Sequence, residues 1–377
     1  MRALVVSVSL CVVTLVAGAG CAANVDDPQG DVGSSEDSVK VDTSSPLGRA
    51  QYDANLAFAK GYKPRCAPRT AGRPRVIVTG FGRFMSITNN ATGRMVSSLS
   101  GVAYPETTPP GEGQVDPPAP QLAVTTTTLD LPHAGKVDVC AMILPVYWDL
   151  AAVLIAKEVD AFGPSFVLMN GVAGDRQPTW IELGSVNRAA PLDDGSNQLR
   201  PVVGKNQSYA PIVPGASKAD GARGLLLSWD HVRTAAAAAI QTHAADMEGD
   251  ERFDAFVPGV ELAGFPRESN TYLCNNVTYV TNYLMSYPGK SVSLMQASVK
   301  KAGAANDLSV TIKRDVKDVP RVFMHWSSAL AGAHVTAGAD VMRNVIDAQL
   351  TAKAAGEAPT MGNNTRANPD LAGGAFF

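Results

Sequence analysis

The sequence has little of what marks several large classes of protein. Lysine and arginine number 32 against 35 aspartates and glutamates, and the formal charge of −3 provides no global field that would hold nucleic acid. The five cysteines follow no C-x-x-C spacing, so neither a zinc ribbon nor a C-x-x-C redox site is indicated. After the N-terminus no run reaches the roughly 18 apolar residues of a membrane span.

What is present is a globular composition, since 45% of the 377 residues are hydrophobic. At about 150 residues per domain, this length fits one large domain or two ordinary ones. Residues 1–20 have the pattern of a secretory signal peptide, with a positive charge at Arg2, an apolar run over residues 3–17 and small residues before Cys21. We therefore expect the protein to be exported.

Cys21 ends this run of small residues, an arrangement that resembles a bacterial lipobox. We expect Cys21 to carry lipid and to anchor the protein to a membrane of the bacterial cell envelope, in the periplasm. Cleavage of an ordinary signal peptide near Ala19 or Ala23 is the alternative. Residues 21–48 are rich in Asp, Ser and Gly without helical periodicity, which predicts a flexible tether.

Short β-branched runs alternate with segments of helical periodicity from residue 75 to residue 354. Strands are predicted at residues 75–79, 122–129, 137–146, 165–169, 253–262 and 321–324. Helices are predicted at residues 91–99, 149–162, 229–247, 272–285 and 337–354. This alternation predicts an α/β fold with helices on both faces of the sheet, as one domain with insertions. Outside this pattern we expect a surface loop at 105–120, a polar insertion at 286–318 and a loose tail at 355–377.

Export has a redox consequence, because disulfides persist outside the cytoplasm. If the signal peptide is removed and Cys21 carries lipid, Cys66, Cys140 and Cys274 remain, an odd number. Cys140 lies in a predicted buried strand and Cys66 just before the first strand. We predict that these two form a disulfide, which requires their Cα atoms to lie within about 7 Å of each other.

Cys274 stands at the start of a predicted helix, where backbone N–H groups and the helix dipole favour a thiolate. A nucleophilic cysteine needs a base, and His325 follows a predicted strand at the end where an α/β sheet places reactive side chains. Glu182 is a candidate for orienting the imidazole. A packed core cysteine and a structural histidine explain the same spacing.

Three segments together resemble the pyroglutamyl-peptidase I family, cysteine peptidases that remove N-terminal 5-oxoproline from peptides. The run V-T-G-F-G-R-F over residues 78–84 is similar to the family's V-T-G-F-x-P-F, with Arg83 in place of the proline. The run Y-L-C-N over residues 272–275 resembles the family's nucleophile motif. The spacing of the family's glutamate signature is matched by Gly171, Gly174, Glu182 and Asn187.

The resemblance covers residues 75–354 and implies an open α/β sandwich with a mixed sheet. It implies that Cys274 is the nucleophile, His325 the general base and acid, and Glu182 the group that holds His325. The substrate-binding positions that it implies are Phe81, Phe84, Asn170, Gly171 and Val172. The substrate would be a peptide or small amide, and the chemistry needs neither a metal nor an organic cofactor. The sequence leaves the oligomeric state open.

Three alternatives keep a similar fold and change the function. The first is a non-catalytic envelope lipoprotein that binds or scaffolds, and the second is a cysteine amidase that acts on cell-wall peptides. The third is a nucleoside-phosphorylase-like enzyme, for which the sequence offers no phosphate-binding glycine–arginine pattern. A thiol-reactive amide probe separates the first alternative from the others, because a binding module would not be labelled at Cys274.

Overall fold

The structure is a computed structural model that describes residues 39–267 and 270–367. The predicted signal peptide, Cys21 and most of the predicted tether therefore lie outside the described residues. Within the described ranges, no helix is both long enough and apolar enough to cross a membrane.

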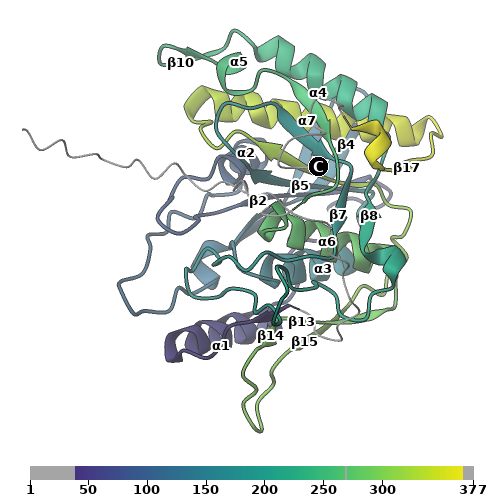
Figure 1. Cartoon of the computed structure of the whole chain (residues 1–377). Coiled ribbons are helices and arrows are strands. Elements are labelled where there is room, and N and C mark those ends of the chain that lie inside the picture. The colour runs from purple at the N-terminus through teal and green to yellow at the C-terminus, as the bar shows by residue number, and fades with distance from the viewer. Residues whose placement is uncertain (1–38, 268–269, 368–377) are drawn as a thin grey trace, which may run out of the picture.

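A nine-stranded mixed sheet forms the middle of the molecule (Figure 1). The main path of the sheet, in spatial order, is β12 (Val260–Ala263), β6 (Thr179–Glu182), β16 (Arg321–Trp326), β5 (Phe166–Val172), β2 (Arg75–Phe81), β4 (Gly135–Leu144) and β3 (Ala123–Leu131). The four central strands β16, β5, β2 and β4 are parallel, whereas β3 and β6 run antiparallel to β4 and β16. Off this path, β9 (Leu226–Leu227) pairs with β16 and with β17 (Thr360–Met361).

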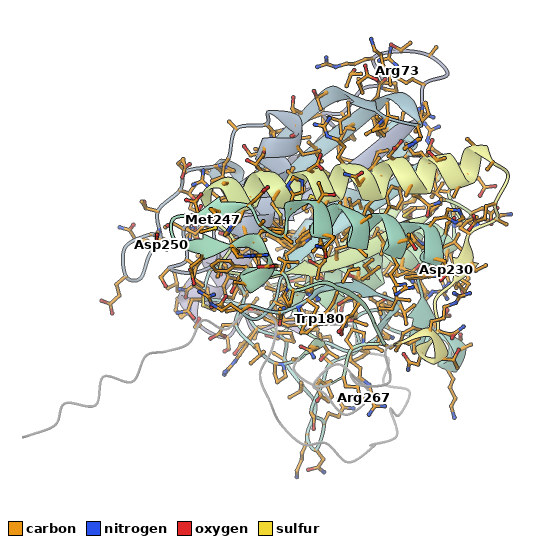
Figure 2. All side chains as sticks on the ribbon, turned by 90° about the horizontal axis from the view of Figure 1, so that it is seen from above. Arg73, Trp180, Asp230, Met247, Asp250 and Arg267 are labelled. Carbon is orange, nitrogen blue, oxygen red and sulfur yellow. A yellow bond between two sulfur atoms is a disulfide. The ribbon has the colours of Figure 1, made fainter. Side chains whose placement is uncertain are left out.

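Helices cover both faces of the sheet, as the sequence predicts (Figure 1). One face carries α2 (Ala91–Ser100), α4 (Trp229–His243), α5 (Phe253–Phe256) and α7 (Gly332–Ala354). The other face carries α1 (Pro46–Gly61), α3 (Leu150–Phe162) and α6 (Leu273–Ser286). Seen from above, α4 and α7 lie side by side, with Asp230 at the start of α4 and Met247 past its other end (Figure 2). The predicted fold class is confirmed.

The central strands are buried on both faces, which explains their largely apolar sequences. In β2, Val76 and Val78 enter the core beneath α2 and α7, whereas Ile77 between them enters the core beneath α3 and α6. All three side chains are fully buried. This alternation fixes which residues of each strand face α6, and so which of them can reach Cys274.

Smaller pieces complete the fold. The two-stranded sheets pair β1 (Lys40–Val41) with β14 (Gln296–Ala297), β7 (Gly184–Val186) with β8 (Ala222–Gly224), β10 (Met247–Glu248) with β11 (Glu251–Arg252), and β13 (Ser291–Leu294) with β15 (Leu308–Thr311). Short 3₁₀ helices span Ala119–Gln121, Lys218–Asp220 and Asn364–Arg366. The predicted polar insertion at 286–318 thus contains the hairpin of β13 and β15.

The structure corrects the predicted limits of the packed region. Val39 and Val41 are buried, and the carbonyl of Lys40 accepts a hydrogen bond of 2.7 Å from the N–H of Val202. Residues 39–48 are therefore not part of a flexible tether, and packing begins well before residue 75. At the other end, β17 joins the sheet, so residues 355–367 of the predicted loose tail are packed in part.

The strand predicted at 253–262 is wrong in its first half. The helix α5 occupies Phe253–Phe256, and β12 begins only at Val260. Phe253 and Phe256 are three residues apart and both side chains are buried, which one helical turn achieves and an alternating strand does not.

Candidate active site

The imidazole of His325 and the carboxylate of Glu182 meet on the face covered by α3 and α6. His325 of β16 pairs with Trp180 of β6, and Glu182, two residues further along β6, points to the same face because side chains alternate along a strand. The Nδ1 atom of His325 lies 3.1 Å from Oε1 of Glu182, and each side chain is 1% exposed. A carboxylate at this nitrogen orients the ring and stabilises the imidazolium form.

The thiol of Cys274 lies beside this pair. Cys274 is the second residue of α6, is 4% exposed and is not part of a disulfide. A Cβ atom placed on Gly171 would lie 3.0 Å from its Sγ, and Gly171 pairs with His325 across β5 and β16. The structure therefore brings the three predicted catalytic side chains to one place, while their catalytic roles stay predictions.

The start of α6 presents backbone N–H groups next to the thiol. The hydrogen bond that opens the helix runs from the N–H of Asn276 to the carbonyl of Tyr272, at 3.0 Å. The N–H groups of residues 273–275 thus precede the helical ladder. Their direction and the helix dipole favour negative charge at this end, which suits both a thiolate and the oxyanion of an acyl-transfer step.

Asn275 fixes the position of this helix start. Its side chain accepts a hydrogen bond from the N–H of Val186 and donates to the carbonyls of Val186 and Arg188, at 2.9, 2.9 and 2.8 Å. Val186 belongs to β7, the strand that follows Glu182. Asn275 belongs to the motif that resembles the nucleophile motif, but the sequence suggested no role for it. In the structure its hydrogen bonds connect the start of α6, which carries Cys274, to the segment that follows Glu182.

Tyr272, the residue before α6, packs against two other aromatic side chains. The ring centroid of Tyr272 lies 6.2 Å from that of Phe84 and 5.5 Å from that of Trp148, and both contacts are edge-on. We refer to Phe84, Trp148 and Tyr272 as the aromatic wall. Phe84 is half-buried, whereas Phe81 is buried in the core cluster that also contains Cys274. Trp148 was not predicted as a site residue, because its sequence context is equally that of a core position.

The three predicted binding residues of β5 have different surroundings. The Asn170 side chain donates to the carbonyl of Thr79 at 2.9 Å and accepts from the indole N–H of Trp326 at 3.0 Å, so it links neighbouring strands. Gly171 leaves room for the thiol of Cys274. Val172 packs against the core on the opposite face. Only the backbone of Val172 is thus available on the side of the thiol.

Two buried carboxyl groups lie in the loops around the wall. Burial raises the pKa of Asp149 to about 6, although Asn276 and the N–H of Met295 hydrogen-bond to the carboxylate. Burial likewise raises the pKa of Asp194 to about 7, against hydrogen bonds from Ser196. Both acids thus titrate closer to neutrality than an exposed aspartate does.

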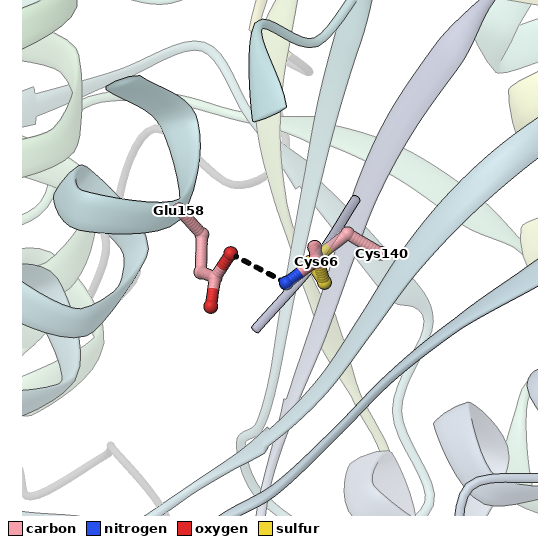
Figure 3. A group of neighbouring side chains, drawn as sticks. All are labelled: Cys66, Cys140 and Glu158. Carbon is pink, nitrogen blue, oxygen red and sulfur yellow. Dashed lines mark hydrogen bonds between the residues drawn. A yellow bond between two sulfur atoms is a disulfide. The ribbon is translucent and has the colours of Figure 1, made fainter. Parts of the chain in front are cut away.

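The predicted disulfide between Cys66 and Cys140 is confirmed, with a Cα–Cα distance of 5.6 Å. Glu158 lies next to it and accepts a hydrogen bond of 3.1 Å from the N–H of Cys66 (Figure 3). The carboxylate also accepts from the N–H of Arg65 at 2.7 Å and from the hydroxyl of Tyr62. The ligand atoms of Cys66, Cys140 and Glu158 are close enough to share a metal, but the two sulfurs are bonded to each other.

A cavity of about 430 Å³ lies at the sheet edge formed by β12, and Asp230, Arg233 and Arg366 contribute to its lining. Its lining includes none of the residues predicted for the active site. The cavity and the candidate catalytic residues are therefore separate features.

Comparison with known proteins finds no matching family model and no matching curated protein. Among solved structures, pyroglutamyl peptidase I of Bacillus amyloliquefaciens is 13% identical with a TM-score of 0.43, over 74% of this chain and 97% of that chain. A mutant pyrrolidone carboxyl peptidase of Pyrococcus furiosus is 16% identical with a TM-score of 0.43, over 73% of this chain and 98% of that chain. Over about three quarters of its length, the chain is similar to solved pyroglutamyl peptidases.

Proposed function

We propose that this protein is a cysteine peptidase that removes N-terminal 5-oxoproline from peptides. The observation that carries the proposal is the placement of Cys274 over Gly171, directly across from His325, with Glu182 on Nδ1 of the same ring. Acyl transfer by a thiolate uses such an arrangement, in which a base lies next to the nucleophile and a carboxylate orients the base. The motif resemblance of residues 78–84 and 272–275 supplies the substrate class.

In the proposed reaction Cys274 gives its thiol proton to His325, and the resulting thiolate attacks the carbonyl that joins oxoproline to the next residue. The N–H groups at the start of α6 would stabilise the oxyanion, and one such donor is typically worth about 10²–10³ in rate. His325 would then give a proton to the leaving amine, and the C–N bond would break to leave an acyl-enzyme. Water, deprotonated by His325, would release oxoproline and restore the thiol.

The substrate side of this proposal rests on the aromatic wall. Oxoproline is uncharged, so its recognition calls for apolar walls and a few amide hydrogen bonds. Phe84 and Tyr272 supply apolar surface close to the start of α6. Backbone groups of residues 170–172 are the proposed hydrogen-bonding partners of the lactam.

Hydrolysis of a fluorogenic oxoprolyl amide by the purified protein tests the proposal, with Cys274→Ala as the inactive control and a prolyl amide as the specificity control. Turnover of the oxoprolyl amide alone is expected. A protein that is labelled at Cys274 by a thiol-reactive amide probe but cleaves only other amides would be a cysteine amidase. A protein that shows neither labelling nor turnover would be the binding module.

We further propose that the protein is exported to the bacterial cell envelope and anchored by lipid on Cys21. The disulfide between Cys66 and Cys140 supports export, because such bonds persist outside the cytoplasm. Replacing Cys21 with serine should release the protein from the membrane fraction and remove the lipid mass from the mature N-terminus. Retention in the membrane fraction with an unchanged N-terminal mass would contradict lipidation.

A further inference from the structure

A buried ion pair lies directly behind the turn that carries Phe84. Arg83 is 2% exposed, and its guanidinium donates to both carboxylate oxygens of Asp116 at 2.7 and 2.6 Å. It also donates to the carbonyl of Met85 at 2.8 Å and to the hydroxyl of Thr107 at 3.2 Å. Asp116 belongs to the Pro/Gly-rich segment that the sequence predicted as a surface loop, so that loop reaches into the protein at this residue.

Asp116 is itself held from three directions. The side chain of Gln51, on α1, accepts from its N–H and donates to its carbonyl, both at 2.7 Å. The amide of Gln121 donates to its carboxylate at 2.8 Å. The hydroxyl of Tyr147 donates to its carbonyl at 3.1 Å. One buried residue therefore joins α1, the Pro/Gly-rich loop, the loop after β4 and the turn after β2.

Two of the partners of Asp116 are chain neighbours of residues in the aromatic wall. Arg83 precedes Phe84, and Tyr147 precedes Trp148, so Asp116 holds the residue before each of the two rings that contact Tyr272. Tyr272, the third residue of the wall, lies two residues before Cys274 in the sequence.

The backbone of the turn gives a second, independent indication that its surroundings hold it in place. Met85 has a φ of 49°, a left-handed conformation that is uncommon for a residue other than glycine. Such a conformation persists where the surroundings determine it. At Met85 the carbonyl accepts from Arg83, and the N–H donates to the carbonyl of Gly195 at 3.1 Å.

We propose that Asp116 is a positioning residue for substrate, which sets the aromatic wall through Arg83 on one side and Tyr147 on the other. The proposal rests on the proposed function in one respect, namely that the wall contacts the acyl group. Removing the carboxylate charge leaves the Arg83 guanidinium buried without its ion-pair partner, which loosens the turn that presents Phe84. The thiol, His325 and Glu182 are untouched, so binding should suffer more than the chemical step.

The test compares Asp116→Asn with Glu106→Gln, a control from the same loop whose carboxylate pairs with Arg94 at the surface. For the oxoprolyl amide, Asp116→Asn should raise KM about tenfold with kcat changed less than twofold, and Glu106→Gln should change neither. If Asp116→Asn does not fold, Arg83→Met/Asp116→Leu replaces the pair by apolar groups; this variant loses the hydrogen bond from Arg83 to the carbonyl of Met85 in the turn and should also raise KM. An unchanged KM in a folded variant overturns the proposal.

A second readout is independent of turnover. Alkylation of Cys274 is followed by mass spectrometry with iodoacetamide and with the bulkier iodoacetanilide, and the ratio of the two rates reports the space beside the thiol. Asp116→Asn should shift this ratio at least threefold, whereas Glu106→Gln should not. A wild-type protein that cleaves no oxoprolyl amide refutes the proposed function, yet the ratio still tests the wall. A ratio equal to that of wild type, with a lowered melting temperature, would make Asp116 purely structural and overturn the proposal.

Discussion

Gly171→Ala tests the placement of the nucleophile with a single methyl group. The new Cβ would lie 2.7 Å from Cζ of Phe323 and 3.0 Å from Sγ of Cys274, well inside the roughly 3.5–4.0 Å of an ordinary carbon contact. Overpacking of this kind costs about 1–3 kcal/mol, and the lower entropy of the unfolded alanine chain offsets about 0.4–1 kcal/mol of it. The net destabilisation should be on the order of 1–2 kcal/mol.

The effect on activity should be larger than the effect on stability. The thiol must move away from Gly171, the residue that pairs with His325 on the neighbouring strand, and a misplacement of about 1 Å can cost on the order of 10²-fold in rate. We expect kcat/KM for the oxoprolyl amide to fall about 100-fold while the protein stays folded. Thermal unfolding, urea titration and single-turnover kinetics provide the three measurements.

Two controls make the result decisive. Gly61→Ala adds a methyl group that would meet no atom within 4 Å beyond its own chain neighbours and helix backbone, so it should leave activity unchanged and stabilise the protein by about 0.4–1 kcal/mol through the unfolded chain. In a Cys274→Ala background the sulfur contact is absent, and Gly171→Ala should then destabilise the protein less than it does in the wild type. If Gly171→Ala is as active and stable as Gly61→Ala, the thiol does not lie where the structure places it and the nucleophile assignment fails.

The remaining predictions address the orienting carboxylate, a buried acid and the disulfide. Glu182→Gln should keep the fold and lower kcat, because it removes the charge that stabilises the imidazolium form; a kcat equal to that of wild type would exclude this role. Asp194 has a raised folded-state pKa, so the native state binds a proton more tightly and stability should fall as pH rises from about 4 to about 7. Asp194→Asn keeps an acceptor for Ser196 and should remove this part of the pH dependence, on the order of 3 kcal/mol between urea titrations at pH 5 and pH 8; an equal difference from wild type at both pH values would contradict it. Replacing Cys66 and Cys140 with serine opens a link across 74 residues and should cost about 2–5 kcal/mol, with kcat unchanged in the protein that remains folded.

The sheet could be predicted because its strands are buried on both faces. The runs at 137–146 and 165–169 are almost entirely apolar, and the structure has β4 and β5 there within a few residues. The prediction failed where elements are short. The two-residue strand β1 leaves no periodic signal, and its burial depends on β14, which lies more than 250 residues away in sequence.

The candidate site was predictable only as a set of residue types in order. Spacing gave no reason to place Glu182 against His325, and the motif resemblance supplied that pairing. The contacts that support the site could not be predicted from the sequence. The ion pair of Arg83 and Asp116 joins residues 33 positions apart through an irregular loop, and Trp148 looks like any core tryptophan until its ring is seen against Tyr272.

The sheet itself explains why the site forms at this point. The register of β5 with β2 extends to the pair Met169 and Thr79, and the Asn170 side chain then donates to the carbonyl of Thr79. The next residue, Gly171, has no side chain, so the start of α6 can approach the strand and place Cys274 over it. Because strands and a helix hold these positions, the geometry should vary little with the surrounding loops. Loop residues such as Asp116 are therefore expected to tune the fit of the acyl group, while the reacting atoms stay in place.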